Sequence, residues 1–306
     1  MRLGILYGGN AAEREVSLTT GQAVYDAIQF EYEAELVLLD GDILSIIDEL
    51  KSYDLVFIAL HGGEGENGKI QHILDDHQIL YTGSGAKASQ LAMDKSATKK
   101  IANLKGIPTP DWVEVTIETA ESQTEIDLPF PFPVVVKPND EGSTFGLTIV
   151  NSATDLLPAL LLASEFSPKI LIEAFIPGRE LTVGILNNTP LPVVEIIPSH
   201  GLFDYECKYT IGLSEYVCPA ELDNQLTSEI QANALDIYQA IGCRHYARID
   251  FRLDPHNHFY LLEVNTLPGF TGTSLLPKSA AKVGLSYRQL VNQIITLAKE
   301  DHDPFL

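Results

Sequence analysis

Residues 246–268 read YARIDFRLDPHNHFYLLEVNTLP and predict a pair of antiparallel strands. Residues 248–251 and residues 262–265 form the two strands, and residues 254–258 connect them. In each strand, polar side chains alternate with apolar ones. Because side chains on a strand point alternately to its two faces, the apolar half of this hairpin should face a core and the polar half should face away from it.

The polar face of the hairpin carries two carboxylates. Arg248 and Asp250 share it on the first strand, and Glu263 and Asn265 share it on the second. A tight turn at residues 256–257 places Asp250 opposite Glu263 and Arg248 opposite Asn265. Carboxylates and an amide oxygen suit Mg²⁺ bound together with substrate phosphates, but an amphipathic strand pair with a solvated polar face fits the same residues. The hairpin alone leaves both interpretations open.

Length and composition limit the class of protein. A chain of 306 residues exceeds what one hydrophobic core usually organises, so we expect two or three domains with clefts between them. Apolar residues make up 45% of the chain and charged residues 20%, which is typical of a compact globular protein. A net charge of -22 would repel a phosphate backbone and argues against nucleic acid as a partner. A nucleotide still fits, because it needs only a few cations that converge locally.

Signals for export or membrane insertion are not found in the sequence. The first residues lead directly into a glycine turn, and no run of about 18 uncharged apolar residues occurs. The cysteines, Cys207, Cys218 and Cys243, are odd in number and form no Cys-x-x-Cys pair, which argues against a disulfide framework or a structural zinc site. We therefore expect a cytoplasmic protein with no membrane partner.

The N-terminal part predicts an α/β unit with a parallel sheet. Short β-rich runs alternate there with helical patterns, at residues 3–7, 35–39, 55–60 and 79–81. The helix after the first run has Ser17 as its expected N-cap. Glu13 lies in the loop after a strand's carboxyl end, where open α/β sheets bind ligands.

A helical segment over residues 86–105 ends at Gly106, and two prolines follow, so a domain junction is expected nearby. Beyond it we expect a small α+β unit, with strands at residues 132–137, 146–150 and 170–175 and a helix that Pro158 interrupts or restarts.

After residue 180 the pattern predicts strands at residues 181–186 and 193–197, a loop-like segment at 199–220, a helix within 225–241, the hairpin, and a C-terminal helix. The fold class is therefore a combination of α/β and α+β. The predicted domains are residues 1–88, 89–176 and 177–306.

Two segments resemble the metal-binding strands of the ATP-grasp superfamily. They are residues 247–250, ARID, and residues 263–269, EVNTLPG. The resemblance implies an ATP-grasp fold that follows an N-terminal parallel-sheet domain. It also implies two Mg²⁺ ions, for which Mn²⁺ is expected to substitute, bound by Asp250, Glu263 and Asn265.

The upstream half of the chain resembles the superfamily's nucleotide site. Lys137 ends a predicted strand and precedes the loop EGSTFG at residues 141–146, whose backbone N–H groups can lie over phosphates. Residues 173–180, EAFIPGRE, resemble the adenine hinge and the ribose site, with Glu173 near the adenine amino group and Glu180 near the ribose hydroxyls. The residues that the resemblance assigns to ATP are Lys95, Lys137, Glu173, Phe175, Ile176, Glu180 and Lys208.

Three further segments resemble the D-alanine–D-alanine ligase family within that superfamily. They are residues 8–17 (GGNAAEREVS), 61–68 (HGGEGENG) and 204–209 (DYECKY), and the last resembles part of the family's lid over the active site. The match is collinear from about Leu3 to the C-terminal helix. Asn67 stands where Asp is common, and His72 stands where a small residue is usual, but neither position is expected to touch the chemistry.

This resemblance implies a reaction. The γ-phosphoryl group of ATP passes to the carboxylate of one D-alanine, the amine of a second D-alanine attacks the acyl phosphate, and the dipeptide supplies peptidoglycan synthesis. Glu13 would hold the first ammonium group, and Arg248 with the backbone N–H of Gly269 would stabilise the oxyanion. The implied substrate-binding residues are Glu13, Val16, Ser17, His61, Arg248, Gly269, Ser274 and Leu275, of which the last two would bind the second carboxylate.

The resemblance also implies a closing lid and a homodimer. Glu13, Ser143 and Tyr209 would form a hydrogen-bonded set that pins the lid, and Lys208 would then reach the transferring phosphate. In the family, Tyr at the lid position goes with a D-amino acid as second substrate, so Tyr209 favours a peptide over an ester. The implied catalytic residues are Glu13, Ser143, Tyr209, Arg248 and Gly269.

Three alternatives remain at this level. A ligase for D-alanine with D-lactate or D-serine, or for another carboxylate and amine, would use the same machinery. A regulatory nucleotide-binding protein would have lost a catalytic residue, yet Lys137, Arg248 and the three metal-ligand candidates are present. A Rossmann-type oxidoreductase is disfavoured because Gly8-Gly9-Asn10 lacks the Gly-x-Gly-x-x-Gly spacing.

Overall fold

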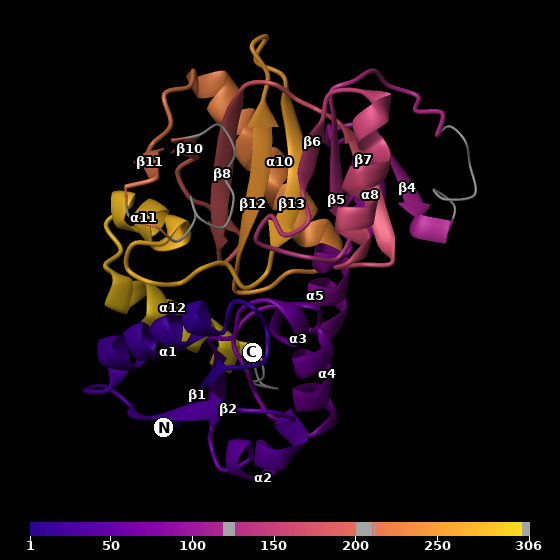
Figure 1. Ribbon diagram of the computed structural model, residues 1–306. Coiled ribbons are helices and arrows are strands. Elements are labelled where there is room, and N and C mark those ends of the chain that lie inside the picture. Colours follow the sequence, from indigo (N-terminus) through magenta and orange to yellow (C-terminus); the bar gives the residue numbers. More distant parts are fainter. Residues whose placement is uncertain (119–125, 200–209, 211, 302–306) are drawn as a thin grey trace.

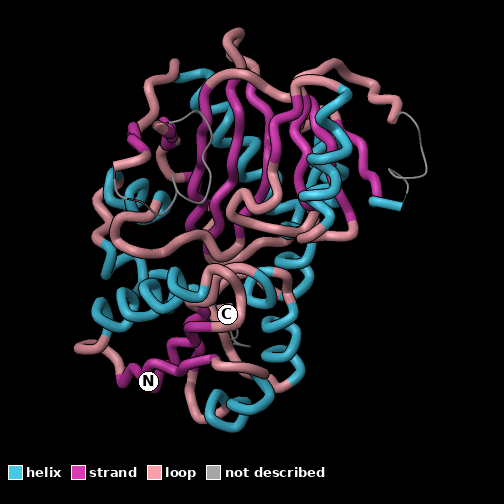
Figure 2. Tube along the Cα trace, viewed as in Figure 1, coloured by secondary structure: helices cyan, strands magenta, loops and turns pink. Residues whose placement is uncertain are grey.

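The computed structural model describes residues 1–118, 126–199, 210 and 212–301, which contain three β-sheets (Figure 1). The N-terminal sheet forms a layer of its own, and the other two sheets stand next to each other above it. Figure 2 shows that loops gather where the N-terminal layer meets the two other sheets. Among the described helices, none is long and apolar enough to cross a bilayer.

The N-terminal sheet is parallel, as predicted, and its strands have the order β2-β1-β3. Val56 also forms a parallel bridge to Tyr81, so the fourth predicted run lies beside this sheet. The elements of this layer are β1 (Arg2–Gly8), α1 (Arg14–Ile28), β2 (Glu33–Leu39), η1 (Ile43–Ile46), α2 (Ile47–Leu50), β3 (Leu55–Ile58), α3 (Gly63–Glu66) and α4 (Lys69–Asp76).

The prediction that Ser17 is an N-cap is wrong. Helix α1 begins three residues earlier, at Arg14, and Glu13 occupies the N-cap position. The Ser17 hydroxyl instead accepts a hydrogen bond from the Gly8 N–H and donates one to the Ala59 carbonyl, both at 2.8 Å. Ser17 therefore ties the carboxyl end of β1 to the segment after β3, which fixes where α1 starts over the sheet.

The helix predicted over residues 86–105 is split into α5 (Ala86–Met93) and α6 (Lys95–Lys105). Asp94 separates them with an extended backbone, and its carboxylate accepts a hydrogen bond from the Ala97 N–H at 2.8 Å. This cap makes Lys95 the first residue of α6. The helix ends at Gly106 in the left-handed conformation, which confirms the predicted stop.

The second sheet is antiparallel, in the order β4-β7-β5-β6, and packs on α8, which confirms the small α+β unit. Pro158 is the third residue of α8, where a helix tolerates a missing N–H, so it restarts the helix after a short 3₁₀ turn. Strand β4 has no counterpart in the sequence prediction. The elements are β4 (Trp112–Thr116), β5 (Val134–Pro138), β6 (Thr148–Val150), η2 (Ala153–Asp155), α8 (Leu156–Ser164) and β7 (Lys169–Ala174).

The third sheet has the order β11-β10-β8-β12-β13, with β9 paired to β8. Strand β11 lies inside the segment predicted to be a loop, and it pairs with β10 through residues 214–217. The predicted C-terminal helix is two helices. The elements are β8 (Arg179–Leu186), β9 (Thr189–Pro190), β10 (Val194–Pro198), β11 (Ser214–Val217), α10 (Asn224–Ile241), β12 (Tyr246–Leu253), β13 (Phe259–Asn265), α11 (Leu275–Lys282) and α12 (Tyr287–Glu300).

The hairpin register is as predicted where it matters, because Asp250 pairs with Glu263 and Arg248 with Asn265. The turn itself differs: Leu253 pairs with Phe259, and the intervening residues make a longer connection than the predicted two-residue turn. A β-bulge after Asp250 offsets this difference by one residue. The bulge also turns Leu262 away from the predicted core face, so that it lines a pocket.

Separate apolar cores lie under the three sheets, and the chain crosses between them. Leu290 and Ile294 of α12 belong to the core of the N-terminal sheet, so the C-terminal helix packs against the layer that begins the chain. The domain boundaries after residues 88 and 176 stay predictions.

Gly178, between β7 and β8, is expected to tolerate no side chain. Its φ is +126°, and a Cβ would lie 2.1 Å from the Leu253 carbonyl oxygen. We predict that Gly178→Ala lowers the free energy of unfolding by about 2–4 kcal/mol, measured by urea denaturation. Gly106→Ala is the matched control, because φ is +72° there but the space is open, and it should cost about 1 kcal/mol. Equal losses in both variants would contradict the close approach.

Candidate active site

Two adjoining pockets lie where the sheets meet, and both are lined by Gly142 of the predicted phosphate loop. The first is bounded by the central and C-terminal sheets. The second is bounded by the start of α1, the phosphate loop, β12 and the segment after β13. All predicted ATP-binding residues that the structure describes line the first pocket: Lys95, Lys137, Glu173, Phe175, Ile176 and Glu180. Lys208 lies outside the described residues.

Glu173, on β7, is held between two lysines. Its Oε2 lies 2.9 Å from Lys137 Nζ and its Oε1 lies 3.2 Å from Lys99 Nζ. Burial alone would raise the pKa of this carboxyl, but Lys137 and Lys99 outweigh that effect and the pKa lies below its ordinary value. Glu173 is therefore an ionised hydrogen-bond acceptor at the wall of the pocket. Lys99 was missed by the sequence analysis, although it follows Lys95 by one helical turn.

The first pocket is also lined by Arg252, a second residue that the sequence did not predict. Its guanidinium lies 3.4 Å from Glu180 Oε2 and donates to the carbonyls of Ile176 (3.2 Å) and Gly178 (2.9 Å). Arg252 thus fixes the hinge segment to β12 and orients the carboxylate implied to hold the ribose. Side chains alternate between the two faces of β12, so Arg252 lies on the same face as Arg248 and Asp250. This spacing is a signal in the sequence that could have indicated a site residue.

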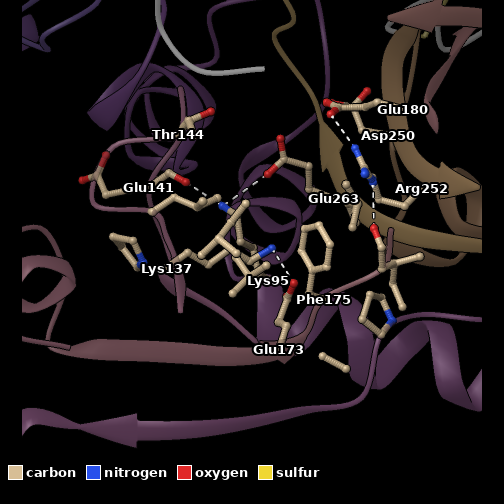
Figure 3. A pocket seen from close by; sticks show the side chains of 18 of the residues that line it. Lys95, Lys137, Glu141, Thr144, Glu173, Phe175, Glu180, Asp250, Arg252 and Glu263 are labelled. Atoms are coloured by element: carbon tan, nitrogen blue, oxygen red, sulfur yellow. Dashed lines mark hydrogen bonds and ion pairs between the residues drawn. The ribbon is translucent and has the colours of Figure 1, made fainter. Parts of the chain in front are cut away.

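Lys95 connects the phosphate loop to the hairpin (Figure 3). Its Nζ donates to the Glu141 carbonyl at 2.5 Å and lies 3.5 Å from Glu263 Oε2. Burial, reinforced by Asp140, raises the pKa of the Glu141 carboxyl. In Figure 3, Lys95 stands between the two acidic residues, at the centre of the pocket.

The hairpin face fits the implied Mg²⁺ ions. Asp250 binds Arg248 through two hydrogen bonds of 2.9 and 2.8 Å and accepts a third from the Asn265 amide nitrogen at 3.0 Å. The Asn265 amide oxygen is thereby left as its ligand atom. Nowhere in the described chain do three or more His, Cys, Asp or Glu side chains form a group that could hold a metal. Two carboxylates and an amide oxygen suit an ion whose other ligands are phosphates and water.

The second pocket collects the predicted substrate residues Glu13, Val16, His61, Arg248, Gly269, Ser274 and Leu275, together with Ser143. Ser17 has no exposed area and does not line this pocket. Ser143 donates a short hydrogen bond to the Glu13 carboxylate, which joins the phosphate loop to the start of α1. Both are buried. Tyr209, the third member of that predicted set, lies outside the described residues.

Two polar anchors shape the remainder of the second pocket. His61 Nε2 lies 2.9 Å from the Thr20 hydroxyl, and its other ring nitrogen lies 3.7 Å from Glu66. The Ser274 hydroxyl accepts a hydrogen bond from the Thr271 N–H at 3.0 Å and precedes α11. Because the first N–H groups of a helix have no partner within it, the start of α11 favours a carboxylate.

A pocket between two antiparallel sheets, with lysines at a glycine-containing loop and an acidic hairpin beside it, defines an ATP-grasp enzyme. The family model "D-ala D-ala ligase C-terminus" matches residues 101–296. The chain belongs to the D-alanine–D-alanine ligase family.

Similar proteins cover nearly the whole chain. The D-alanine–D-alanine ligase of Pelotomaculum thermopropionicum is 41% identical, with 98% of each chain covered. That of Aquifex aeolicus is 43% identical, with 97% of this chain and 100% of the relative covered. The Bacillus anthracis ligase complexed with ATP has a TM-score of 0.85 and 33% identity, with 98% of each chain covered. The VanG D-Ala:D-Ser ligase of Enterococcus faecalis has a TM-score of 0.83 and 30% identity, with 97% and 99% covered.

Proposed function

We propose that this chain joins two D-alanine molecules to D-alanyl-D-alanine, with ATP converted to ADP and phosphate through an acyl phosphate, as a step in peptidoglycan synthesis. The observation that carries this proposal is the adjacency of the two pockets. The first is lined by the predicted ATP residues other than Lys208, the second is lined by the predicted D-alanine residues other than Ser17, and Gly142 borders both. A phosphoryl group that leaves the first pocket thus meets a carboxylate bound in the second.

In this proposal the chain acts mainly by positioning and by neutralising charge. Lys95 and Lys137 bind the phosphates, and Glu13 holds the ammonium group of the first D-alanine. Arg248 and the Gly269 N–H stabilise the oxyanion that forms when the second amine attacks. Ser274 and the Leu275 N–H hold the second carboxylate at the start of α11.

Two Mg²⁺ ions, or Mn²⁺ in their place, would be held by Asp250, Glu263 and Asn265. When bound, they supply positive charge to the phosphate oxygens. Asp250 must then share its oxygens between the ions and Arg248, with which it already makes two hydrogen bonds.

The proposal has three further parts. A lid that carries Lys208 and Tyr209 closes over the site, the protein is a homodimer, and it lies in the cytoplasm. Sedimentation of the purified protein tests the dimer. A Tyr209→Phe variant tests the lid: it should keep ATP binding and lose discrimination between D-alanine and D-lactate as second substrate. Unchanged discrimination at neutral pH would contradict the assigned role.

A second candidate is the ligation of D-alanine to D-serine. The similarity to the VanG D-Ala:D-Ser ligase, at 30% identity over nearly the whole chain, supports this second candidate. Both candidates share the first pocket and differ only in which molecule enters beside Ser274.

The deciding experiment measures ADP release by the purified protein with ATP and Mg²⁺, and identifies the products by mass. We expect D-alanyl-D-alanine from D-alanine alone, with little D-alanyl-D-lactate or D-alanyl-D-serine from mixtures. A mixed product as the main species would keep the mechanism and overturn the specificity. ADP release that does not depend on any of these substrates would contradict the function.

A further inference from the structure

Lys99 is a buried cation that the proposed mechanism does not use. It comes from α6, and its side chain has no exposed area. Its Nζ donates to the Thr109 hydroxyl at 2.7 Å and to the Pro110 carbonyl at 3.2 Å, and it lies 5.4 Å from the centre of the Trp112 ring. These contacts hold the ammonium group against β4, 3.2 Å from Glu173 Oε1. A ligand in the pocket cannot reach Lys99 directly.

The second cation beside Glu173 has a competing task. Lys137 lies 2.9 Å from Glu173 Oε2, but it also lines the first pocket, where it is proposed to bind phosphate. A single ammonium group that turns toward phosphate weakens its contact with the carboxylate. A fully buried carboxylate without a counter-ion takes up a proton, because burial disfavours the charged form.

We propose that Lys99 is a positioning residue that keeps Glu173 ionised, as the acceptor for the adenine amino group, while Lys137 engages the phosphates. This inference rests on the proposed function, since it assumes that ATP binds in the first pocket with adenine at Glu173. It assigns to two similar lysines two separate tasks: Lys137 serves the phosphates and Lys99 serves base selection.

The consequence is a test of base selectivity. An ionised Glu173 only accepts hydrogen bonds, which suits the amino group of adenine, whereas a protonated Glu173 can also donate to a carbonyl oxygen. Inosine triphosphate carries a carbonyl oxygen in place of the amino group. In Lys99→Met we expect KM for ATP to rise roughly tenfold and the preference for ATP over inosine triphosphate to fall roughly tenfold, with kcat changed much less.

Two variants separate positioning from general damage. Lys100→Met removes the next lysine, which is exposed, and should leave both KM and base preference as in the wild type. Lys99→Arg keeps the charge and should restore most of the preference. A folded Lys99→Met protein with wild-type base preference would overturn the inference, as would a Lys99→Arg protein as unselective as Lys99→Met.

A pH profile provides a readout if Lys99→Met fails to fold. Burial lowers the pKa of Lys99 to about 8, although Glu173 from β7 and Asp111 before β4 raise it again and Lys137 from β5 lowers it further. As pH rises through about 8, the wild-type Lys99 loses its proton and Glu173 loses a counter-ion, so the dissociation constant of ATP should increase. Lys99→Arg stays charged and should bind ATP with little change over this range.

Equilibrium dialysis with ATP and Mg²⁺ measures this constant without D-alanine. An alkaline weakening that is the same in the wild type and Lys99→Arg would overturn the inference. Because dialysis requires no ligation, a wild type that binds ATP but forms no dipeptide would contradict the proposed function and leave this test intact. A wild type that binds no ATP would contradict both.

Discussion

Glu263→Gln is expected to reduce D-alanine-dependent ADP release by a factor on the order of 100 or more. The substitution keeps the shape of the side chain and removes one negative charge from the face on which Mg²⁺ is proposed to bind. It also removes the ion pair with Lys95, whose Nζ lies 3.5 Å away. Metal binding and ATP turnover should therefore weaken together, so the Mg²⁺ concentration that gives half the maximal rate should rise.

Glu229→Gln is the control for this variant, because it removes an equal charge from an exposed position on α10. It should behave as the wild type. Thermal unfolding of both variants checks that the hairpin is intact. Unchanged ADP release in Glu263→Gln, at any Mg²⁺ concentration, would refute the metal assignment while leaving the nucleotide pocket in place.

Arg248→Met is expected to lower kcat by about 10²–10³, with a smaller effect on KM for ATP. Arg248 lines the second pocket, and its guanidinium is held in place by two hydrogen bonds to Asp250. A planar donor fixed in this way can meet the negative charge that develops on the oxygen of the carbonyl group under attack. The loss should therefore appear mainly in the chemical step, measured in single-turnover experiments with saturating ATP.

Arg252→Met is the matched variant, because Arg252 lies on the same strand and the same face but at the other pocket. It contacts Glu180 and the hinge carbonyls. We expect it to raise KM for ATP and to change kcat by less than about tenfold. If both arginine variants lowered kcat and raised KM for ATP to the same extent, the division of the site into a nucleotide pocket and a substrate pocket would be wrong.

The sequence predicted the strand pairing at the candidate site correctly, because that signal was local. Alternation of polar and apolar residues placed Asp250 opposite Glu263, and the structure has that pairing. The end of the helix at Gly106 was also predicted from neighbouring residues, namely the glycine itself and the two prolines that follow it. Predictions that needed distant partners failed: Ser17 was taken as an N-cap, but its hydroxyl bonds to Gly8 and Ala59 across the sheet.

The two missed residues show the same limit. Lys99 reads as an ordinary helix lysine, and only its packing beneath Glu173 shows that it is a buried partner of the pocket. Arg252 lies on a predictable face, but its contact with Glu180 joins strands that are remote in sequence. The position of β11 could not be read from its own four residues, because its hydrogen bonds depend on β10.

By itself, the sequence determined the parallel N-terminal unit, the polar face of the hairpin and, through motifs spread along the chain, the enzyme family. Those features depend on residues that are close in the chain, because the spacing of apolar side chains and the residue preferences of turns are local. The tertiary structure decided which side chains meet: Glu13 with Ser143, and Glu173 with both Lys99 and Lys137. Burial and charge pairing depend on contacts between segments far apart in the chain, so only the folded arrangement sets the charge state of the site.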